Sequence, residues 1–189
     1  MLHTKKQILI ILLVAITSII NGQKNMETIL ICYGDFYPEK VKNYKYVIIE
    51  PSIFSKMDVA LLKAQNKHVL AYISLGEVNE SASHFKALKS ESLGKNEIWN
   101  SHIIDLAAPI TNEVILELID SHILEKGFDG LFLDNIDNYT KFGPTPEKKK
   151  DLLALLETVN TTYKDIIIMQ NAGLLIIEDT KPFIDLIAV

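Results

Sequence analysis

The sequence predicts an α/β fold built on a parallel sheet with crossover helices. Short β-branched runs alternate with longer stretches in which apolar residues recur at helical spacing. This alternation is typical of parallel strands joined by helices, and short runs that are apolar throughout indicate strands buried on both faces. The chain has 189 residues, of which 48% are hydrophobic and 23% charged, and this composition fits one globular domain.

The first residues have the pattern of an export signal. Lys5 and Lys6 precede an apolar run that begins at Ile8, and small Gly22 offers a cleavage position. The run is shorter than the roughly 20 residues that a membrane anchor needs, so a cleaved leader is favoured over an anchor. We expect residues 1–22 to be a signal peptide and residues 23–189 to form the domain. The mature protein is then secreted or periplasmic, without stable membrane insertion.

Six apolar runs are the expected strands. Their lengths and their β-branched content are typical of strands, and polar or glycine-containing segments separate them from the helical stretches. They are Thr28–Tyr33, Tyr46–Glu50, His68–Ser74, Gly130–Asp134, Ile166–Gln170 and Phe183–Val189.

Three stretches between these runs predict amphipathic helices, at 55–65, 111–126 and 146–163. The second is expected to begin at Thr111 and to end at Gly127, and the third opens on a proline. The polar stretch from Glu77 to Ile104 predicts a long loop, a feature that is unusual in compact domains and often belongs to a binding site. It contains Trp99, which serves either as the wall of a subsite or as a packing anchor.

Polar side chains follow several of the predicted strands. The carboxyl ends of the strands in a (β/α) barrel form one rim, so polar residues at these ends are expected to line one pocket. In a single open sheet the same residues would be spread along an edge. The positions concerned are Tyr33 to Asp35, Glu50, Ser74 to Glu77, Asp134 to Asp137, and Gln170 with Asn171.

Asp134 is the strongest candidate for a catalytic carboxylate. Glycines and a buried strand lead into it from Gly127, and Asp137 and Tyr139 follow closely. A simpler role remains open, because aspartate at the end of a strand often caps the next helix. Asp134 and Asp137 could also hold a cation, but neither a nearby histidine nor calcium-loop spacing supports a metal site. We expect neither a metal nor another cofactor.

Three motifs resemble glycoside hydrolase family 114, whose members are TIM-barrel domains related to endo-α-1,4-polygalactosaminidase. They are Ala71-Tyr72-Ile73-Ser74-Leu75-Gly76-Glu77, Gly127-Phe128-Asp129-Gly130-Leu131-Phe132-Leu133-Asp134-Asn135-Ile136-Asp137, and Met169-Gln170-Asn171-Ala172-Gly173. Their order and separation match the family's pattern over most of the chain after residue 22. The resemblance implies a (β/α)8 barrel that hydrolyses a glycosidic bond in an amino-sugar polymer, with Asp134 as the catalytic acid.

A glycosidase usually needs a second carboxyl group that works as base or nucleophile. Glu77 or Asp137 could supply it, and Glu77 is the catalytic candidate of the two, although it can equally serve to orient a sugar hydroxyl or a neighbouring side chain. Aromatic rings, carboxylates and amides at the rim are expected to bind substrate, and among the aromatic residues Tyr139 is favoured over Tyr72, which falls inside a strand. The substrate-binding candidates are Tyr33, Asp35, Glu50, Tyr72, Asp137, Tyr139, Gln170 and Asn171.

Charge and histidine spacing exclude other classes of partner. The formal net charge of -5 provides no basic field for nucleic acid, whereas a neutral or cationic ligand such as a polysaccharide or oligosaccharide fits. The five histidines show no metal-ligand spacing, and we interpret them as surface or packing residues.

The barrel is expected to be truncated after about six strands, because eight strands and about 250 residues are typical of the full fold. In the family that the sequence resembles, a further carboxylate tends to follow the sixth strand. The corresponding position lies just beyond Val189. Three hypotheses therefore stay open: an active glycosidase, a catalytically silent carbohydrate-binding remnant, and a barrel enzyme of another kind such as an aldolase. The absence of a lysine at any predicted strand end argues against the aldolase.

Overall fold

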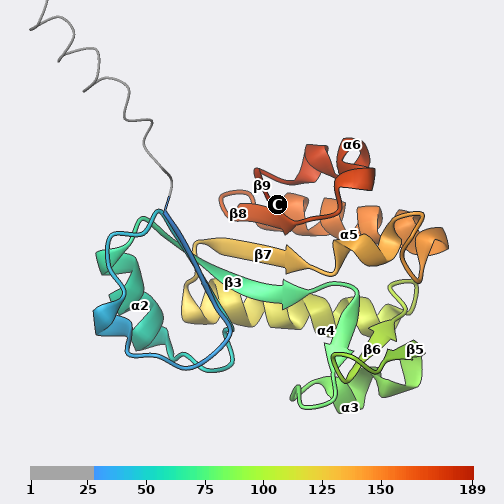
Figure 1. The fold of residues 1–189 in the computed structure, drawn as a ribbon, viewed down its shortest axis with the longest axis horizontal. Coiled ribbons are helices and arrows are strands. Elements are labelled where there is room, and N and C mark those ends of the chain that lie inside the picture. The colour runs from blue at the N-terminus through green and yellow to red at the C-terminus, as the bar shows by residue number, and fades with distance from the viewer. Residues whose placement is uncertain (1–27) are drawn as a thin grey trace, which may run out of the picture.

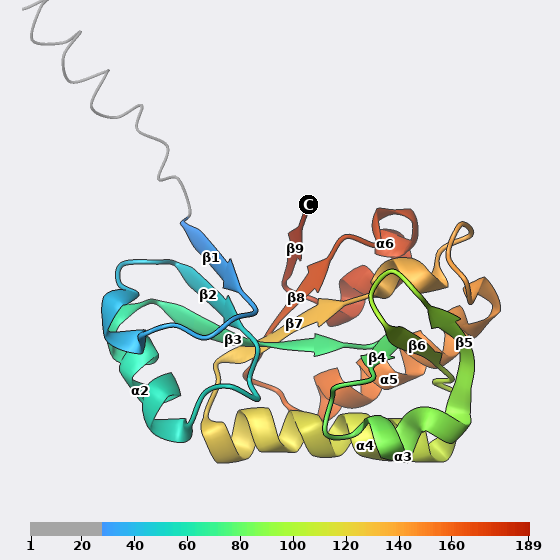
Figure 2. The same ribbon diagram turned by 60° about the horizontal axis from the view of Figure 1, so that its bottom comes forward.

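Six parallel strands form the main sheet of the structure, a computed structural model that describes residues 28–189 (Figure 1). Each overlaps one of the six runs expected from the sequence. Figure 2 shows the sheet curling as part of a (β/α) barrel with β1 and β9 at its edges. In spatial order the strands are β1 (Ile29–Cys32), β2 (Tyr46–Ile49), β3 (His68–Ser74), β7 (Gly130–Asp134), β8 (Ile167–Asn171) and β9 (Leu186–Ala188).

Helices cover the convex face of this sheet. The long ones are α2 (Lys56–Gln65), α4 (Pro109–Asp120) and α5 (Lys149–Thr162), and the short ones are α3 (Phe85–Leu88) and α6 (Ile177–Thr180). Short 3-10 segments lie at η1 (Pro38–Lys40), η2 (Lys89–Glu91), η4 (Ile136–Tyr139), η5 (Pro146–Lys148), η6 (Leu174–Ile176) and η7 (Lys181–Phe183). No helix of residues 28–189 is long and apolar enough to cross a membrane. The expected signal peptide lies outside the described residues.

The ends of the helices follow from local chemistry. Ser55 caps α2 through a reciprocal pair of hydrogen bonds, in which Asp58 N donates to Ser55 Oγ at 3.3 Å and Ser55 N donates to Asp58 Oδ2 at 2.9 Å. The expected start of α4 at Thr111 was wrong. The helix begins at Pro109, whose fixed φ suits the first helical position, and Thr111 is buried in the first turn.

The segment after α4 is a π-helical turn, η3 (Ser121–Lys126). It ends at Gly127, whose φ of 79° lies in the left-handed region that favours glycine, so the expected end of this helical stretch is confirmed.

The stretch expected to be a long loop is instead a small antiparallel sheet. Its strands are β4 (Glu77–Asn79), β5 (Ser92–Asn96) and β6 (Ser101–Ile104), in the order β4-β6-β5, with α3 between β4 and β5. We call this element the inserted sheet. Figure 2 shows it beside the carboxyl end of β3, from which β4 emerges.

Alternation along the strands separates two cores. Val47, Val69, Leu131 and Ile168 belong to a large cluster that includes the buried side chains of α2, α4 and α5. The residues between them point to the concave face, where Tyr46, Ile48, Leu70, Phe132 and Met169 form a second cluster. Because side chains alternate with a period of two, the same face receives Tyr33, Glu50, Tyr72, Asp134 and Asn171 at the carboxyl ends of the strands.

Candidate active site

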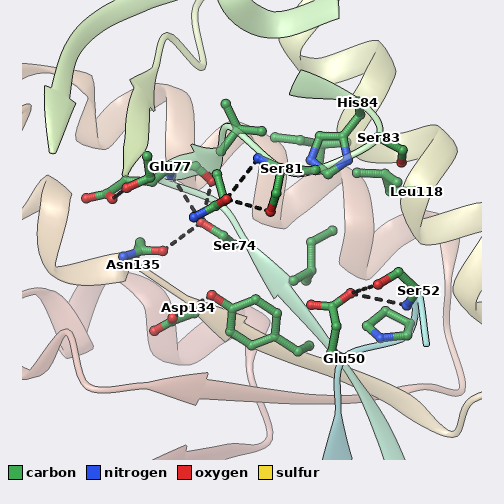
Figure 3. Close-up of a pocket in the computed structure, with 18 of the residues that line it drawn as sticks. Glu50, Ser52, Ser74, Glu77, Ser81, Ser83, His84, Leu118, Asp134 and Asn135 are labelled. Carbon is green, nitrogen blue, oxygen red and sulfur yellow. Dashed lines mark hydrogen bonds between the residues drawn. The ribbon is translucent and has the colours of Figure 1, made fainter. Parts of the chain in front are cut away.

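A pocket of about 940 Å³ opens at the carboxyl ends of β3 and β7 and extends along the inserted sheet (Figure 3). We call it the rim pocket. Its acidic residues are Glu50, Glu77 and Asp134, and its lining contains neither lysine nor arginine. The remaining polar and aromatic lining residues are Tyr33, Ser52, Tyr72, Ser74, Asn79, Ser81, Ser83, His84, Trp99, Ser101, His122 and Asn135.

Asp134 is held by two donors from the neighbouring strands. The Tyr72 hydroxyl donates to Asp134 Oδ2 at 2.8 Å, and Asn171 Nδ2 donates to Asp134 Oδ1 at 2.7 Å. Hydrogen bonds of this kind to a charged acceptor are short and roughly twice as strong as neutral ones. The carboxylate therefore has a fixed position on the concave face, with one donor on each side.

Tyr72 remains a donor at neutral pH. Burial raises the pKa of its hydroxyl, and the neighbouring charge of Asp134 raises that pKa further. Tyr33 packs its ring edge-on against Tyr72 with the centroids 4.8 Å apart, and burial together with Asp134 also raises the pKa of the Tyr33 hydroxyl. The two phenols thus form a neutral, partly aromatic wall next to the carboxylate.

Two residues immediately after the strands have left-handed backbone conformations. Asn135, which follows Asp134, has a φ of 61°, and Ala172, which follows Asn171, has a φ of 52°. For a residue such as alanine this conformation is uncommon, and such strain clusters at functional sites. Both turns redirect the chain directly after a rim side chain, and Ser74 Oγ lies 2.6 Å from Asn135 Oδ1 beside the first of them.

Glu77 is 9% exposed and has neutral partners on every side. Asn96 Nδ2 donates to both carboxylate oxygens at 3.2 Å, Asn138 Nδ2 donates to Oε1 at 3.3 Å, and the Ser101 hydroxyl donates to Oε2. Asn96 and Ser101 belong to the inserted sheet, as Glu77 does, and the contact with Asn138 joins this sheet to η4. Glu77 therefore has the geometry of a residue that orients neighbouring side chains and so positions the inserted sheet, and orienting a neighbouring side chain was one of the alternatives that the sequence left open.

Glu50 presents a different arrangement. Its Oε1 accepts from Ser52 N at 3.1 Å and from Ser52 Oγ at 2.8 Å. Figure 3 shows the other oxygen turned away from Ser52 and into the pocket. Of the two glutamates in the pocket, Glu50 is the one whose second oxygen accepts no hydrogen bond from another side chain of residues 28–189 and points into the pocket.

Four residues expected to bind substrate lie elsewhere. Tyr139 is 1% exposed and its hydroxyl donates to Leu75 O at 2.7 Å, so it belongs to the core. Gln170 is fully buried on the helix-facing side of β8 and donates to Ala172 O at 2.8 Å. Asp137 accepts from Gly173 N at 3.1 Å, outside the pocket lining, and Asp35 is exposed outside it as well.

The match to a family model decides the family. The model described as glycoside-hydrolase family GH114 matches residues 28–189, which is every residue that the structure describes. The chain belongs to family GH114. A search of curated proteins gave no significant match.

Several solved structures are similar in fold to this chain. The glycoside hydrolase domain of PelA from Pseudomonas aeruginosa is 23% identical with a TM-score of 0.75, over 86% of this chain and 66% of that domain. Aspergillus fumigatus Ega3, solved in complex with galactosamine, is 18% identical with a TM-score of 0.69, over 83% of this chain and 63% of that one. An α-galactosidase from Thermus thermophilus is 11% identical with a TM-score of 0.61, over 85% of this chain and 40% of that one. This GH114 chain spans just under two thirds of the length of the PelA domain and of Ega3.

Sequence reasoning missed part of the pocket of this GH114 chain. His84 and His122 were interpreted as surface or packing residues, yet both line the pocket. Burial lowers the pKa of His84, and burial with the nearby Lys126 and His84 lowers the pKa of His122 to about 4. Both histidines are therefore neutral at pH 7. Neither follows a barrel strand, so strand ends gave no signal for them.

Proposed function

We propose that this chain acts as a glycoside hydrolase on an amino-sugar polysaccharide, with Asp134 as the carboxylate on which the chemistry depends. The observation that carries the proposal is the position of Asp134 on the concave face, between the Tyr72 hydroxyl and the Asn171 amide. Membership of GH114 supports the glycosidase class. The signal peptide expected at residues 1–22 fits action on a polysaccharide outside the cell.

The two donors to Asp134 suit an ionised carboxylate better than a proton donor, because both present hydrogen to its oxygens. A glycosidic bond breaks through a transition state with oxocarbenium character, and a fixed negative charge below the ring stabilises it. We therefore assign Asp134 the charged role, as nucleophile or electrostatic stabiliser, in place of the acid role implied by the sequence resemblance.

Glu50 is the candidate for the second carboxyl group. Both carboxylate oxygens of Glu77 accept hydrogen bonds from protein side chains, whereas Glu50 directs one oxygen into the pocket. From there Glu50 can contact the substrate, as a proton donor to the leaving oxygen or as the acceptor of a substrate N–H or O–H.

The charge of the pocket supports an amino sugar. Three carboxylates line it, no lysine or arginine does, and its two histidines have pKa values lowered by burial. A pocket walled by one sign of charge attracts the opposite sign, so a protonated amino group fits better than a neutral or an anionic sugar.

A substrate panel tests this proposal. The protein is incubated with α-1,4-linked polygalactosamine, its N-acetylated form and polygalacturonate, and new reducing ends are counted. We expect release from the amino polymer, much less from the acetylated form because it lacks the charge, and none from the anionic polymer. Equal release from the amino and the acetylated polymer would contradict the electrostatic part of the proposal.

A second function, carbohydrate binding without hydrolysis, is favoured by the way Glu77 is used. If Glu77 only positions the inserted sheet and Glu50 only contacts the substrate, the pocket lining offers no second catalytic carboxyl group beside Asp134. Binding of polygalactosamine measured by calorimetry, without any new reducing ends, would establish this second function.

A further inference from the structure

Trp99 is a large aromatic side chain that is exposed beside the rim pocket. It lies in the turn between β5 and β6, is 71% exposed, and belongs to the pocket lining. Burying so large an apolar side chain would stabilise the fold, so its exposure gives up that contribution to the free energy. Tryptophan is enriched at interfaces, where one part of its ring is apolar and its N–H can remain in water, so its position beside a polar pocket suits contact with a ligand.

Hydrogen bonds fix the backbone that carries this ring. Asn79 Nδ2, on β4, donates to Trp99 O at 2.8 Å, and Ile98 N donates to Asn96 Oδ1 at 3.2 Å. Asn100 follows with a φ of 49°, a left-handed conformation that asparagine tolerates better than most residues. The turn is therefore preorganised, which lowers the entropy cost of binding a ligand there.

Trp99 and Asp134 lie on different walls of the same pocket. Asp134 comes from β7 of the barrel. Trp99 comes from the inserted sheet, whose strands are joined to one another by the hydrogen bonds of Asn96 and Ser101 with Glu77. The volume of about 940 Å³ is near the upper end of the range of about 300–1,000 Å³ for small-molecule sites. It is larger than a single sugar ring requires.

We propose that Trp99 forms a second sugar subsite, which stacks on a ring of the same oligosaccharide that Asp134 engages. One face of a hexose carries mainly C–H groups, which pack against the indole, and a protonated amino group near the ring adds a cation–π attraction. This inference rests on the proposed amino-sugar substrate, and it assigns the inserted sheet the task of selecting chains over monomers.

The chain contains one tryptophan, so its fluorescence reports on this position alone. The test uses galactosamine and an α-1,4-linked galactosamine hexamer, with binding measured by calorimetry and by tryptophan emission. We expect the hexamer to shift the emission and the monomer to leave it unchanged. In Trp99→Ala the hexamer should bind about tenfold more weakly, equivalent to about 1.4 kcal/mol, while monomer affinity stays the same. Trp99→Phe should retain most of the hexamer affinity.

Tyr37→Ala is the matched control, because Tyr37 is 67% exposed and lies outside the pocket lining. It should leave both affinities unchanged. Hexamer binding that is equally tight in Trp99→Ala would overturn the subsite and leave the proposed function standing. If neither sugar binds to the unmodified protein, the proposed function fails and the subsite fails with it.

Discussion

The buried histidine on the π-helical turn predicts a specific loss of stability in acid. His122 is 8% exposed, and its Nδ1 has no hydrogen-bond partner within residues 28–189. Burial is the main reason that its pKa falls from 6.5 to about 4, and Lys126 and His84 lower it further. In the unfolded chain the same imidazole takes up a proton near its ordinary pKa.

The direction and size of the effect follow from that difference. Between pH 6.5 and about pH 4, His122 is protonated in the unfolded state and neutral in the folded state. The free energy of unfolding therefore decreases as the pH falls through this window. A difference of about 2.5 pKa units, at about 1.4 kcal/mol per unit, corresponds to about 3 kcal/mol. This is an upper value, because water entering the pocket would weaken the burial.

The assay is urea unfolding at pH 7 and at pH 4.5, on the unmodified protein and on His122→Leu. Protonation of carboxylates with lowered pKa values, such as Asp105 and Asp58, also destabilises the protein in acid, but it does so equally in the unmodified protein and in the variant. The variant should therefore lose less stability than the unmodified protein over this range, by up to about 3 kcal/mol. Identical losses would refute the assignment of a neutral, buried His122.

Two further substitutions separate catalysis from architecture. Tyr72→Phe removes a hydrogen bond to Asp134 that is worth about 1.5–3 kcal/mol. We expect kcat/KM to fall roughly tenfold to a hundredfold, with little change in the free energy of unfolding. Undiminished hydrolysis would show that this hydrogen bond does not contribute to catalysis. Glu77→Gln replaces an acceptor oxygen by an amide group that faces the donors Asn96 and Asn138. Because donors then face each other, the free energy of unfolding should fall by about 2–4 kcal/mol. Turnover per folded molecule should stay near that of the unmodified protein. A stable Glu77→Gln protein without turnover would instead make Glu77 catalytic.

The main sheet was predictable because each strand carries one uninterrupted signal. Gly130–Asp134 is apolar up to its last residue, and its burial by β3, β8 and the helices requires that pattern. The inserted sheet gave no such signal. β5 (Ser92–Asn96) is polar and half exposed, and it contains an irregularity between Ser92 and Gly94, so its composition resembles that of a loop.

At β8 the sequence placed the end of the strand one residue too early, and that residue decides which side chain faces the pocket side of the sheet. The strand expected to end at Gln170 continues to Asn171, and alternation then turns Gln170 to the helices and Asn171 to Asp134. The prediction that Tyr139 faces the pocket was wrong for a related reason. The left-handed Asn135 sets the course of η4, which brings the Tyr139 hydroxyl to the carbonyl of Leu75 inside the core.

A comparison of Asp134→Asn with Asp137→Asn tests the central claim most directly. Both changes replace a carboxylate by an amide of nearly the same shape in the same segment, but only Asp134 lines the pocket. Turnover of polygalactosamine and calorimetric binding of the galactosamine hexamer are measured on each variant. We expect Asp134→Asn to lose at least about 10²-fold in turnover while the hexamer still binds, and Asp137→Asn to keep its turnover. Turnover that survives in Asp134→Asn, or that is lost equally in both variants, would contradict the account.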